Sequence, residues 1–512
     1  MTEIIKDITD QEQHIQYATF LELAETESDP SLQSDLLLAH RFAEHIQEFG
    51  GQALVVGGFA RDLTLSIASG ESHISKDIDI EVYKIEPEHL KEILQQFGKV
   101  DLVGQTFEVI KLTNPESGNA LDFSIPRRDS KVGEGHKGFE ITGDPDMSIQ
   151  EAARRRDFTV NALALDPLTG ELHDYFDGVS DAKDKVLRAT DNNLFGDDPL
   201  RALRAVQFSA RFEMTIDPET AQLCRSFDLT ELSNERIGEE WEKLLTKAEK
   251  PSIGLKLAKE LGIIDQLHPE LTVLEHTEQE ADWHPEGNVW NHTMLVVDAA
   301  AKIARLEQLK NDDDNDEMLV VMLGALCHDL GKATTTEKML KEGVMRITAH
   351  GHDIAGVEPT ESLLKTLHVK KDTVKKVVSI VKAHMYHVGN SEPSEKQIRK
   401  LSIRLEPANI RLWDLVCRSD SNGRGEEEFR DVTSSNAIYR RAIELEVDKK
   451  PPENIVFGRD LLALNIGFEP GPKLGQTLRI LYDAQLGGKF ATAEDGVAYL
   501  KDNLQEILEQ TS

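Results

Sequence analysis

The sequence has few cysteines, no long apolar run and many fewer basic than acidic residues. Its three cysteines, Cys224, Cys327 and Cys417, lie far apart and show no metal-ligand spacing, which favours a reducing compartment. The longest apolar run, Met318–Cys327, is too short to span a bilayer. The acidic first residues lack the apolar core of a signal peptide. We therefore expect a cytoplasmic protein with no membrane partner.

The charge balance limits the kinds of partner. The 512 residues include 58 basic and 92 acidic side chains, which gives a formal charge of −34. Such a surface disfavours sequence-independent binding of nucleic acid over its whole extent, but a local basic groove is compatible with it. At this length the chain can build several hydrophobic cores, so several domains are expected.

Strand-like and helical patterns change along the chain. Residues 1–50 predict a helical extension, because apolar positions recur at helical spacing. Strand-like runs such as LVVGG, IDIEVYKI and ALDFSI then alternate with helical ones, interrupted by Arg127–Asp146, which we expect to be a mobile loop. Strand signals almost vanish beyond Ala189, so the predicted fold class is α+β. The predicted domains are residues 1–50, 51–190, 191–280, 281–430 and 431–512.

A glycine pair and an aspartate pair mark the start of the mixed region. The apolar run Leu54–Val56 ends in Gly57 and Gly58, which let backbone N–H groups approach a phosphate closely. Asp77 and Asp79 point to the same face of a strand, where two carboxylates repel each other unless a divalent cation lies between them. Two metals commonly serve attack on phosphorus in this way. Alone, the pattern is weak, because a surface Asp-x-Asp is often structural.

Further residues could complete a nucleotide site. Asp122, in ALDFSI, could be a third carboxylate that helps to deprotonate an attacking hydroxyl, or an acidic residue at a strand edge. Arg154, Arg155 and Arg156 precede Asp157, and they suit triphosphate and ribose contacts or form a solvated face. Both interpretations are open from these residues alone.

Asp198 and Arg201 are predicted to share one face of a helix that begins near Pro199. An ordinary ion pair is one interpretation. The other is base recognition, because cytosine and adenine each present an amino donor beside a ring-nitrogen acceptor, whereas uracil and guanine present the reverse. An aspartate acceptor beside an arginine donor therefore matches C and A without a nucleic-acid template.

The motifs LVVGGFARD with DID, RRDFTVNAL, DYFDGVSDAKDKVLRA and DDPLRALRAVQFSARF occur in this order. As a set they resemble the bacterial class II tRNA nucleotidyltransferase (CCA-adding enzyme) and poly(A) polymerase family over residues 50–245. The resemblance implies a polymerase-β-like head followed by a helical neck. It also implies that Asp77 and Asp79 hold two Mg²⁺ ions, and that SNERIGEEW, from Ser233 to Trp241, buttresses the templating helix.

The resemblance also assigns residues to the nucleotide. Those expected around it are Gly57, Gly58, Arg61, Asp62, Arg156, Asp157, Asn161, Asp198, Arg201, Arg204 and Arg211. Among them, Arg156 and Asp157 would meet the ribose, and Asp198 with Arg201 would be the amino-acid template. The sequence departs from the family at two positions: Asp197 stands for the usual Glu and keeps its charge, whereas Gln207 stands for the usual Arg and removes a cation.

A second group of potential metal ligands lies on helical segments: His292, His328, Asp329, His352, His384 and Asp420. Imidazole and carboxylate together suit borderline divalent metals, and Lys332 can meet phosphate. The group resembles the HD phosphohydrolase domain over about 280–425, which implies hydrolysis of 2′,3′-cyclic phosphates and related phosphomonoesters with Ni²⁺, Mn²⁺ or Mg²⁺. The alternative is a degenerate HD fold retained for tRNA contact.

Together these features predict template-independent addition of CCA to tRNA 3′ ends from CTP and ATP, by a monomer or homodimer. The tail would contact tRNA, and Arg127–Asp146 would help the switch from C to A. Bacterial poly(A) polymerases usually lack an HD domain, which favours the CCA interpretation. The alternatives are a poly(A) polymerase, a CC-only or A-only enzyme, an HD phosphohydrolase whose head holds RNA, and a non-catalytic tRNA-binding protein.

Overall fold

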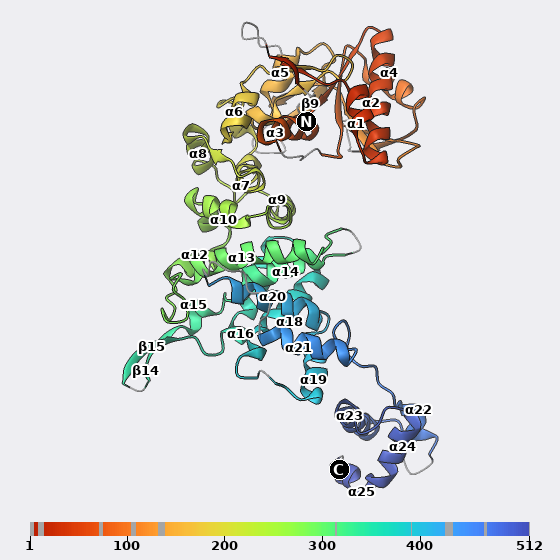
Figure 1. Cartoon of the computed structure of the whole chain (residues 1–512), viewed down its shortest axis with the longest axis vertical. Coiled ribbons are helices and arrows are strands. Elements are labelled where there is room, and N and C mark those ends of the chain that lie inside the picture. The colour runs from red at the N-terminus through yellow and green to blue at the C-terminus, as the bar shows by residue number, and fades with distance from the viewer. Residues whose placement is uncertain are drawn as a thin grey trace. The chain divides into compact units, whose positions relative to one another are not determined.

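A computed structural model describes residues 5–8, 15–70, 75–103, 109–131, 139–312, 315–341, 343–390, 392–424, 434–464 and 468–510. The chain forms two compact units that divide between Glu231 and Leu232. The first unit contains a large sheet, and the second is mainly helical (Figure 1). This arrangement confirms the predicted α+β class. Among the described helices, none is long and apolar enough to cross a membrane.

The first unit is built on a nine-stranded mixed sheet. Its strands, in spatial order, are β1 (Ile5–Ile8), β2 (Ile15–Tyr17), β11 (Glu171–His173), β10 (Ala164–Leu165), β3 (Gln52–Val56), β4 (Asp79–Tyr83), β7 (Ala120–Ser124), β6 (Val109–Thr113) and β5 (Lys99–Val103). β3 runs antiparallel to β4, and β4 runs parallel to β7. The parallel register places Asp79 opposite Asp122.

The first fifty residues are part of this unit, so the predicted separate extension is wrong. β1 and β2 join the sheet, and α1 (Phe20–Thr26) and α2 (Pro30–Glu48) contribute to its core. Phe42 of α2 is buried against Phe123 of β7, with ring centroids 4.6 Å apart. The helical spacing of apolar residues predicted these helices, but it carries no information on which surface they cover.

Shorter elements complete the first unit: α3 (Gly58–Ser69), α4 (Pro87–Leu94), α5 (Ile149–Arg154), η1 (Thr159–Asn161), α6 (Gly178–Asp184), β12 (Val186–Leu187), η2 (Phe195–Asp197), α7 (Leu200–Phe212), β13 (Thr215–Ile216) and α8 (Pro218–Arg225). Arg127–Asp146, expected to be a loop, instead contains an antiparallel ribbon of β8 (Arg127–Lys131) and β9 (Phe139–Gly143). Residues 132–138 of the expected loop lie outside the described residues.

The second unit is organised around α14 (Glu317–Cys327), which packs between α13 (Val289–Leu306), α18 (Lys371–Val381) and α20 (Ile410–Asn422). Every residue of α14 from Met318 to Cys327 is buried. A helix that is apolar on all sides needs neighbours on all sides, which explains the longest apolar run of the sequence. An antiparallel hairpin, β14 (Glu337–Lys341) and β15 (Val344–Thr348), was not predicted.

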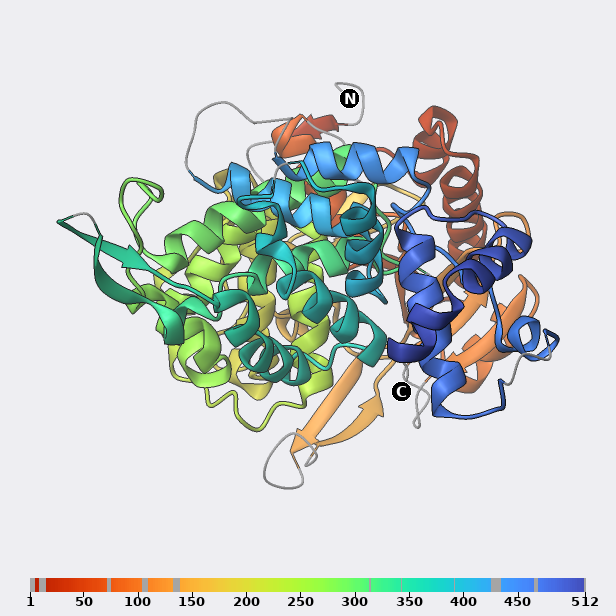
Figure 2. The ribbon, with the colours of Figure 1, turned by 90° about the horizontal axis from the view of Figure 1, so that it is seen from below.

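The other helices of the second unit are α9 (Asn234–Lys247), α10 (Pro251–Glu260), α11 (Ile263–Leu267), α12 (Pro269–Thr272), η3 (Val273–His276), α15 (Lys332–Thr335), α16 (His352–Ala355), α17 (Val357–Thr366), η4 (His384–His387), α19 (Glu395–Leu405), α21 (Ser434–Glu444), α22 (Gly458–Leu462), α23 (Pro472–Leu486), α24 (Ala493–Asp502) and α25 (Leu504–Gln510). The last four form a separate group around their own apolar core (Figures 1 and 2).

Two predicted domain boundaries differ from this packing. The predicted neck, residues 191–280, contains the division at Glu231, so α7 and α8 belong to the first unit and α9 to α12 to the second. Helix α9 packs on α14 and α17, so closely that a Cβ on Gly238 would clash with the carbonyl oxygen of Leu367. Helix α21, predicted to begin the tail, packs on α19 and α20.

The buried contact of Phe42 generates a stability prediction. Phe42→Ala should lower the free energy of unfolding of the first unit by about 3–5 kcal/mol, because it leaves a cavity beneath the sheet. All four tryptophans lie in the second unit, at 241, 283, 290 and 413. The far-UV circular dichroism transition in urea should therefore shift while the tryptophan fluorescence transition stays in place. Leu21→Ala, at an exposed position of α1, is the control. An unshifted transition for Phe42→Ala would indicate instead that residues 1–50 form an extension that does not stabilise the first unit.

Candidate active sites

Three carboxylates of the first unit lie near the start of β4, beside the middle of β7. Asp79 begins β4 and is partly buried, Asp122 lies opposite it on β7, and the exposed Asp77 precedes β4 by two residues. Burial, and then the charge of Asp122, raises the pKa of Asp79 to about 6, although Arg156 opposes the shift. A divalent cation would relieve this crowding, and carboxylate oxygens are the ligands that Mg²⁺ prefers. The residues present therefore fit a Mg²⁺ site.

The turn after β3 brings backbone close to these carboxylates. Gly57 has φ = 67° and caps the start of α3. A Cβ at this position would lie 3.2 Å from Asp79 Oδ2 and 3.5 Å from Arg156 Nη1. Glycine is thus needed both for the backbone conformation and for the space beside the carboxylate. The predicted strand–turn–helix is present.

Below the turn, a chain of hydrogen bonds links three elements. Arg61 Nε donates to Asp62 Oδ1 at 2.7 Å, and Arg61 Nη1 donates to Asn161 Oδ1 at 2.9 Å. Asn161 Nδ2 donates to Asp157 Oδ1 at 2.8 Å, and Arg204 Nε donates to Asp157 Oδ2 at 2.6 Å. We call these five residues the buried relay. It connects α3, η1 and α7, the three elements that carry the predicted nucleotide ligands.

The relay residues differ in burial: Arg61, Asp62, Asp157 and Asn161 are buried, whereas the side chain of Arg204 is 33% exposed. Asp62 is only 1% exposed, and its Oδ1 accepts a hydrogen bond from Arg61. Burial would raise the pKa of Asp157, but Arg204 and Asn161 outweigh it and keep this pKa below its usual value. Both oxygens of Asp157 already accept hydrogen bonds, and the neighbouring Arg156 lies 3.5 Å from Glu81 Oε1 through Nη2. Arg211 reaches toward Asp62, with Nη2 3.8 Å from Oδ2.

The predicted base-reading pair is arranged differently from the expectation. Helix α7 begins at Leu200, so Asp198 precedes the helix and its Oδ1 accepts the Leu200 N–H at 3.1 Å. The expectation that Asp198 and Arg201 share a face of one helix is therefore wrong, because Asp198 is itself extended and lies outside the helix, with Pro199 between it and Leu200. Arg201 donates to the carbonyl oxygens of Leu194 and Arg155, at 2.8 and 2.7 Å.

Gln207, where an arginine was expected, points into the interior. It is 1% exposed, and its Nε2 has no hydrogen-bond partner within the described part of the chain. A longer charged side chain at this buried position would need a partner that the glutamine lacks. The departure from the family pattern therefore changes the interior of α7 and not an exposed surface.

The second unit brings all six predicted HD ligands together. His292 Nε2 lies 3.0 Å from Asp420 Oδ1 and 3.4 Å from His328 Nε2. Asp329 approaches His328 Nε2 through Oδ2, at 3.2 Å, and His352 Nε2 through Oδ1, at 3.3 Å. The six come from α13, α20, α16, η4 and the segment that directly follows α14. Two groups with ligand atoms within 4.8 Å of one another share Asp329: one with His292 and His328, the other with His352 and His384.

Backbone carbonyls fix the orientation of these rings. The Nδ1 atoms of His328, His352 and His384 lie 2.6–2.8 Å from the carbonyl oxygens of Ala325, Ala349 and Val381, respectively. When Nδ1–H donates to a carbonyl, Nε2 of the neutral ring carries a lone pair. The Nε2 atoms of His352 and His384 face each other at 3.0 Å. Facing lone pairs repel unless a cation lies near them, so the residues present fit a divalent metal.

Sequence analysis missed two residues that hold this cluster, His284 and Glu286. Glu286 Oε1 lies 2.7 Å from His292 Nδ1 and 2.8 Å from His284 Nδ1. Lys332 Nζ lies 2.7 Å from Asp329 Oδ2 and donates to Gln279 at the same distance. His284 and Glu286 precede α13 in HPEG, where only their spacing could have indicated ligands. Four of the six predicted ligands, Asp329, His352, His384 and Asp420, line a cavity of about 820 Å³, which we call the HD cavity.

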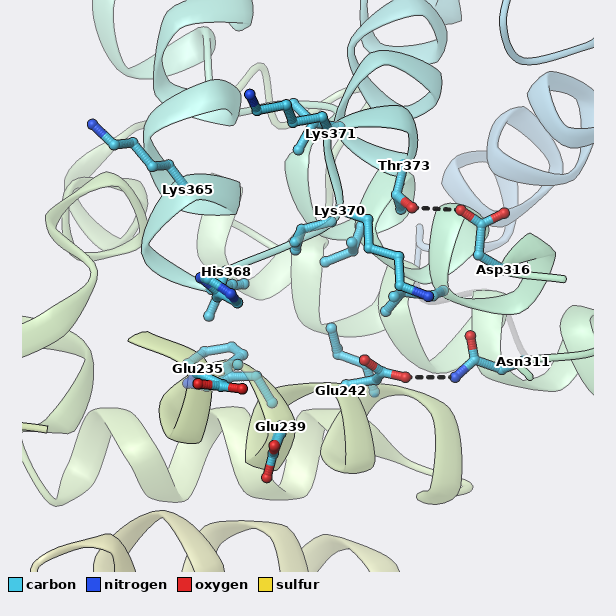
Figure 3. Close-up of a pocket in the computed structure, with 18 of the residues that line it drawn as sticks. Glu235, Glu239, Glu242, Asn311, Asp316, Lys365, His368, Lys370, Lys371 and Thr373 are labelled. Atoms are coloured by element: carbon cyan, nitrogen blue, oxygen red, sulfur yellow. Dashed lines mark hydrogen bonds between the residues drawn. The ribbon is translucent and has the colours of Figure 1, made fainter. Parts of the chain in front are cut away.

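A second cavity in this unit, of about 1050 Å³, lies between α9 and the turn from α17 to α18 (Figure 3). One wall carries Glu235, Glu239 and Glu242, and the opposite wall carries lysines. We define the lysine rim as Lys365, Lys370, Lys371 and Lys375. In contrast to Lys376, which pairs with Asp316 and Asp372, the four have no ion pair within the described ranges.

Three family models match parts of the chain. The "Poly A polymerase head domain" family model matches residues 53–188, the "HD domain" model matches 289–414, and the model "Probable RNA and SrmB- binding site of polymerase A" matches 213–274. A "Multifunctional CCA protein" of Xanthomonas campestris pv. campestris (strain B100) is 33% identical over 387 residues, which cover 73% of this chain and 86% of that relative.

Two solved structures share the fold. The Bacillus stearothermophilus CCA-adding enzyme in complex with CTP is 21% identical, with a TM-score of 0.64 over 94% of this chain and 100% of its own. The Thermotoga maritima CCA-adding enzyme complexed with tRNA is 17% identical, with a TM-score of 0.55 over 97% of this chain and 99% of its own.

The HD ligands generate a prediction about pH. Burial would lower the pKa of His292, but hydrogen bonds to Asp420 and Glu286 outweigh it and raise this pKa to about 9. Below that pH, His292 is protonated and must lose a proton to ligate a metal. The affinity for Mn²⁺ should therefore rise about tenfold per pH unit up to pH 9, with release of about one proton per ion. Titration calorimetry in buffers of different ionisation enthalpy measures this release.

Two variants test whether the released proton comes from metal binding at the HD ligands. Asp329→Ala should abolish the proton-coupled component, because both groups of ligands share this carboxylate. Asp77→Ala, in the other unit, should leave it intact. Binding without proton release in the unmodified chain would contradict the protonated state of His292.

Proposed function

Because the chain belongs to the family of multifunctional CCA proteins, we propose that its head adds C, C and A in turn to the 3′ end of tRNA. The tRNA 3′-hydroxyl would attack the α-phosphate of CTP and then of ATP, with release of pyrophosphate. The observation that carries this proposal is the placement of Asp79 opposite Asp122, on neighbouring parallel strands beside the Gly57 turn. Two Mg²⁺ ions held by Asp77 and Asp79 would activate the attacking oxygen and stabilise the leaving group.

The protein residues around the carboxylates have distinct proposed roles. Asp122 is partly exposed and lies 3.7 Å from Lys111 Nζ, so it is accessible to take the proton of the attacking hydroxyl. The backbone at Gly57 and Gly58 would approach the triphosphate, with Arg61 held in place by the buried relay. Arg156, beside Asp79, would meet the ribose. Arg211 would lie on the primer side.

Base selection is proposed for Asp198 and Arg201. Arg201 uses two of its five N–H donors on the carbonyl oxygens of Leu194 and Arg155, which fixes the guanidinium and leaves donors for a base. Asp198 supplies the acceptor that an exocyclic amino group needs. The contact of Arg201 with backbone on both sides would make the selectivity sensitive to movement of η2 and of the segment after α5.

For the second unit we propose a metal-dependent phosphohydrolase. When bound, a divalent metal would supply an activated water and polarise the phosphate; Mn²⁺, Ni²⁺ and Mg²⁺ are the proposed ions. Asp329 would be among the residues that hold the metal, and Lys332 would hold Asp329 in position. The substrates proposed are 2′,3′-cyclic phosphates and related phosphomonoesters.

The two proposed activities can be separated by a crossed pair of variants. Asp77→Ala should reduce nucleotide addition by at least about 10²-fold, because it removes a group that stabilises charge in the transition state. The same variant should hydrolyse 2′,3′-cyclic phosphates at the rate of the unmodified chain. Asp329→Ala should show the opposite pattern. Addition is measured with Mg²⁺, a tRNA that lacks its 3′ CCA, and labelled CTP, ATP, UTP or GTP offered singly and in pairs.

The length of the products distinguishes the alternatives. Two additions with CTP alone and one more with ATP are expected. Products that end at CC would indicate a CC-only enzyme, and long A tracts would indicate a poly(A) polymerase. Absence of incorporation, with hydrolysis retained, would overturn the head activity and leave a phosphohydrolase with an RNA-holding head.

We further propose that tRNA follows the lysine rim. The model for an RNA-binding site matches residues 213–274, which include α9, the wall of the cavity opposite the rim. Lys370 and Lys371 flank the N-terminus of α18, where the helix dipole is already positive. Lys365 and Lys371 extend outward from the cavity (Figure 3), so phosphates would run along its outer edge, away from the glutamates. In a chain of net charge −34, this unpaired positive group favours a polyanion.

Salt dependence tests the lysine rim. Lys370→Gln with Lys371→Gln should weaken tRNA binding and reduce the slope of log affinity against log salt by about 1.4–1.8, because each phosphate contact contributes roughly 0.7–0.9. Binding is measured by filter retention between low and high salt. The control, Lys91→Gln with Lys99→Gln, removes the same charge from α4 and β5 of the head. Equal slopes in the two double variants would contradict a specific contact.

The compartment and oligomeric state remain predictions from the sequence. Cys224, Cys327 and Cys417 are free and buried, which suits a reducing compartment, and we propose the cytoplasm. A monomer or a homodimer is the proposed state.

A further inference from the structure

The wall of the HD cavity carries one exposed tryptophan. Trp283 is 67% exposed, whereas Trp241, Trp290 and Trp413 are buried. A large aromatic ring that stays in water forgoes the stabilisation that burial would give it. Its position in the lining of a cavity that also holds Asp329 and His352 indicates that it meets a ligand there.

The backbone of Trp283 is fixed from the side of the β14–β15 hairpin. Its N–H and that of His284 both donate to the carbonyl oxygen of Glu280, at 3.1 and 2.9 Å. The carboxylate of Glu280 in turn accepts the N–H of Ile347 at 2.9 Å and a bond from Arg346 at 3.0 Å. The turn that carries the tryptophan is therefore tied to β15.

The same backbone is fixed from the side of the metal ligands. The ring of His284, the next residue, contacts Glu286 at 2.8 Å, and Glu286 contacts the metal ligand His292 at 2.7 Å. A tryptophan side chain has only two rotatable bonds, so a fixed backbone leaves the ring little freedom to lose on binding. The backbone that carries the Trp283 ring is thus held by β15 on one side and by Glu286, which contacts His292, on the other.

The rest of the cavity has the opposite chemistry. Lys332 and Arg424 line it together with the metal ligands, and Arg424 Nε is buried without a hydrogen-bond partner in the portion of the chain that is described. Cationic groups and metal ligands suit a phosphate, whereas an indole suits a flat, uncharged ring. A cavity of about 820 Å³ is large enough for both parts of a nucleotide.

We propose that Trp283 stacks on the nucleobase of the phosphate ester that the HD cavity binds. The preferred substrates are then nucleoside and RNA-terminal 2′,3′-cyclic phosphates and phosphomonoesters, in preference to base-free phosphate esters. Stacking accepts any base, because every base has a π-face, so Trp283 confers a preference for nucleotides and not for one sequence. This inference rests on the proposed HD function for its substrate, but the binding step is testable without hydrolysis.

Iodide quenching of tryptophan fluorescence measures binding directly. Trp283 is the exposed tryptophan of the four, so it should account for the accessible fluorescence, and Trp283→Phe should remove that component. Adenosine 2′-phosphate, added to the full chain with Mn²⁺, should protect the accessible component, whereas glycerol 2-phosphate should not. Equal protection by both compounds, or protection by neither, would overturn the stacking proposal. This outcome does not depend on whether the HD cavity hydrolyses anything.

Hydrolysis provides the second readout. Trp283→Ala should raise the KM for adenosine 2′,3′-cyclic phosphate by about 5- to 100-fold with little change in kcat, the range expected for loss of one base–aromatic stack. Trp283→Phe should retain most of the affinity. The rate with glycerol 2-phosphate, and nucleotide addition by the head, should stay within about twofold in both variants.

A matched control separates stacking from a general change at the cavity. Val388 is also exposed and lines the same cavity, so Val388→Ala removes apolar surface without removing a ring. It should leave the KM for the cyclic nucleotide nearly unchanged. A loss of kcat on both substrates in Trp283→Ala would assign the tryptophan a structural role and refute the proposal. Absence of hydrolysis in the unmodified chain, with nucleotide-specific protection intact, would refute the phosphohydrolase and support the nucleotide site.

Discussion

Both candidate sites of this protein depend on one constraint: potential metal ligands that repel each other are held close together. Asp79 and Asp122 are held opposite each other by the register of two parallel strands, and the Nε2 atoms of His352 and His384 are held face to face by carbonyls behind them. Neither arrangement is favourable by itself, so the surrounding packing must hold it. The sheet does so in the first unit and the bundle around α14 does so in the second. A bound cation relieves this repulsion, and the relief contributes to its binding free energy.

The buried relay has a different role from the accessible ligands. It connects Asp62 to Arg204 through Arg61, Asn161 and Asp157, so α3, η1 and α7 form one hydrogen-bonded assembly. Loss of any member would leave a buried charge or amide unsatisfied and would displace the others. The motifs around these residues therefore reflect support of the site as much as contact with its substrate.

The sequence predicted residue types and element types better than burial and packing partners. The six HD ligands, spread from His292 to Asp420, were predicted because their chemistry is specific, and the bundle brings them together. The helical periodicity of residues 1–50 was also informative, but the surface that those helices cover depends on tertiary contacts such as Phe42 with Phe123. Asp198 was misplaced because it adopts an extended backbone conformation, and the helix begins two residues later, at Leu200. Trp283 and Glu286 lie in an irregular segment, where no periodicity indicates orientation.

The central position of α14 has a consequence for synthesis of the chain. Ten successive apolar residues with no polar face are a strong aggregation hazard until their neighbours exist. Helix α13 precedes α14 along the chain, but α18 and α20 follow it, so part of this surface waits for later residues. The acidic run NDDDNDE adjoins this apolar segment in the sequence, and its last residue begins α14. Charges that flank an apolar segment in this way disfavour association of chains in which the segment is still exposed.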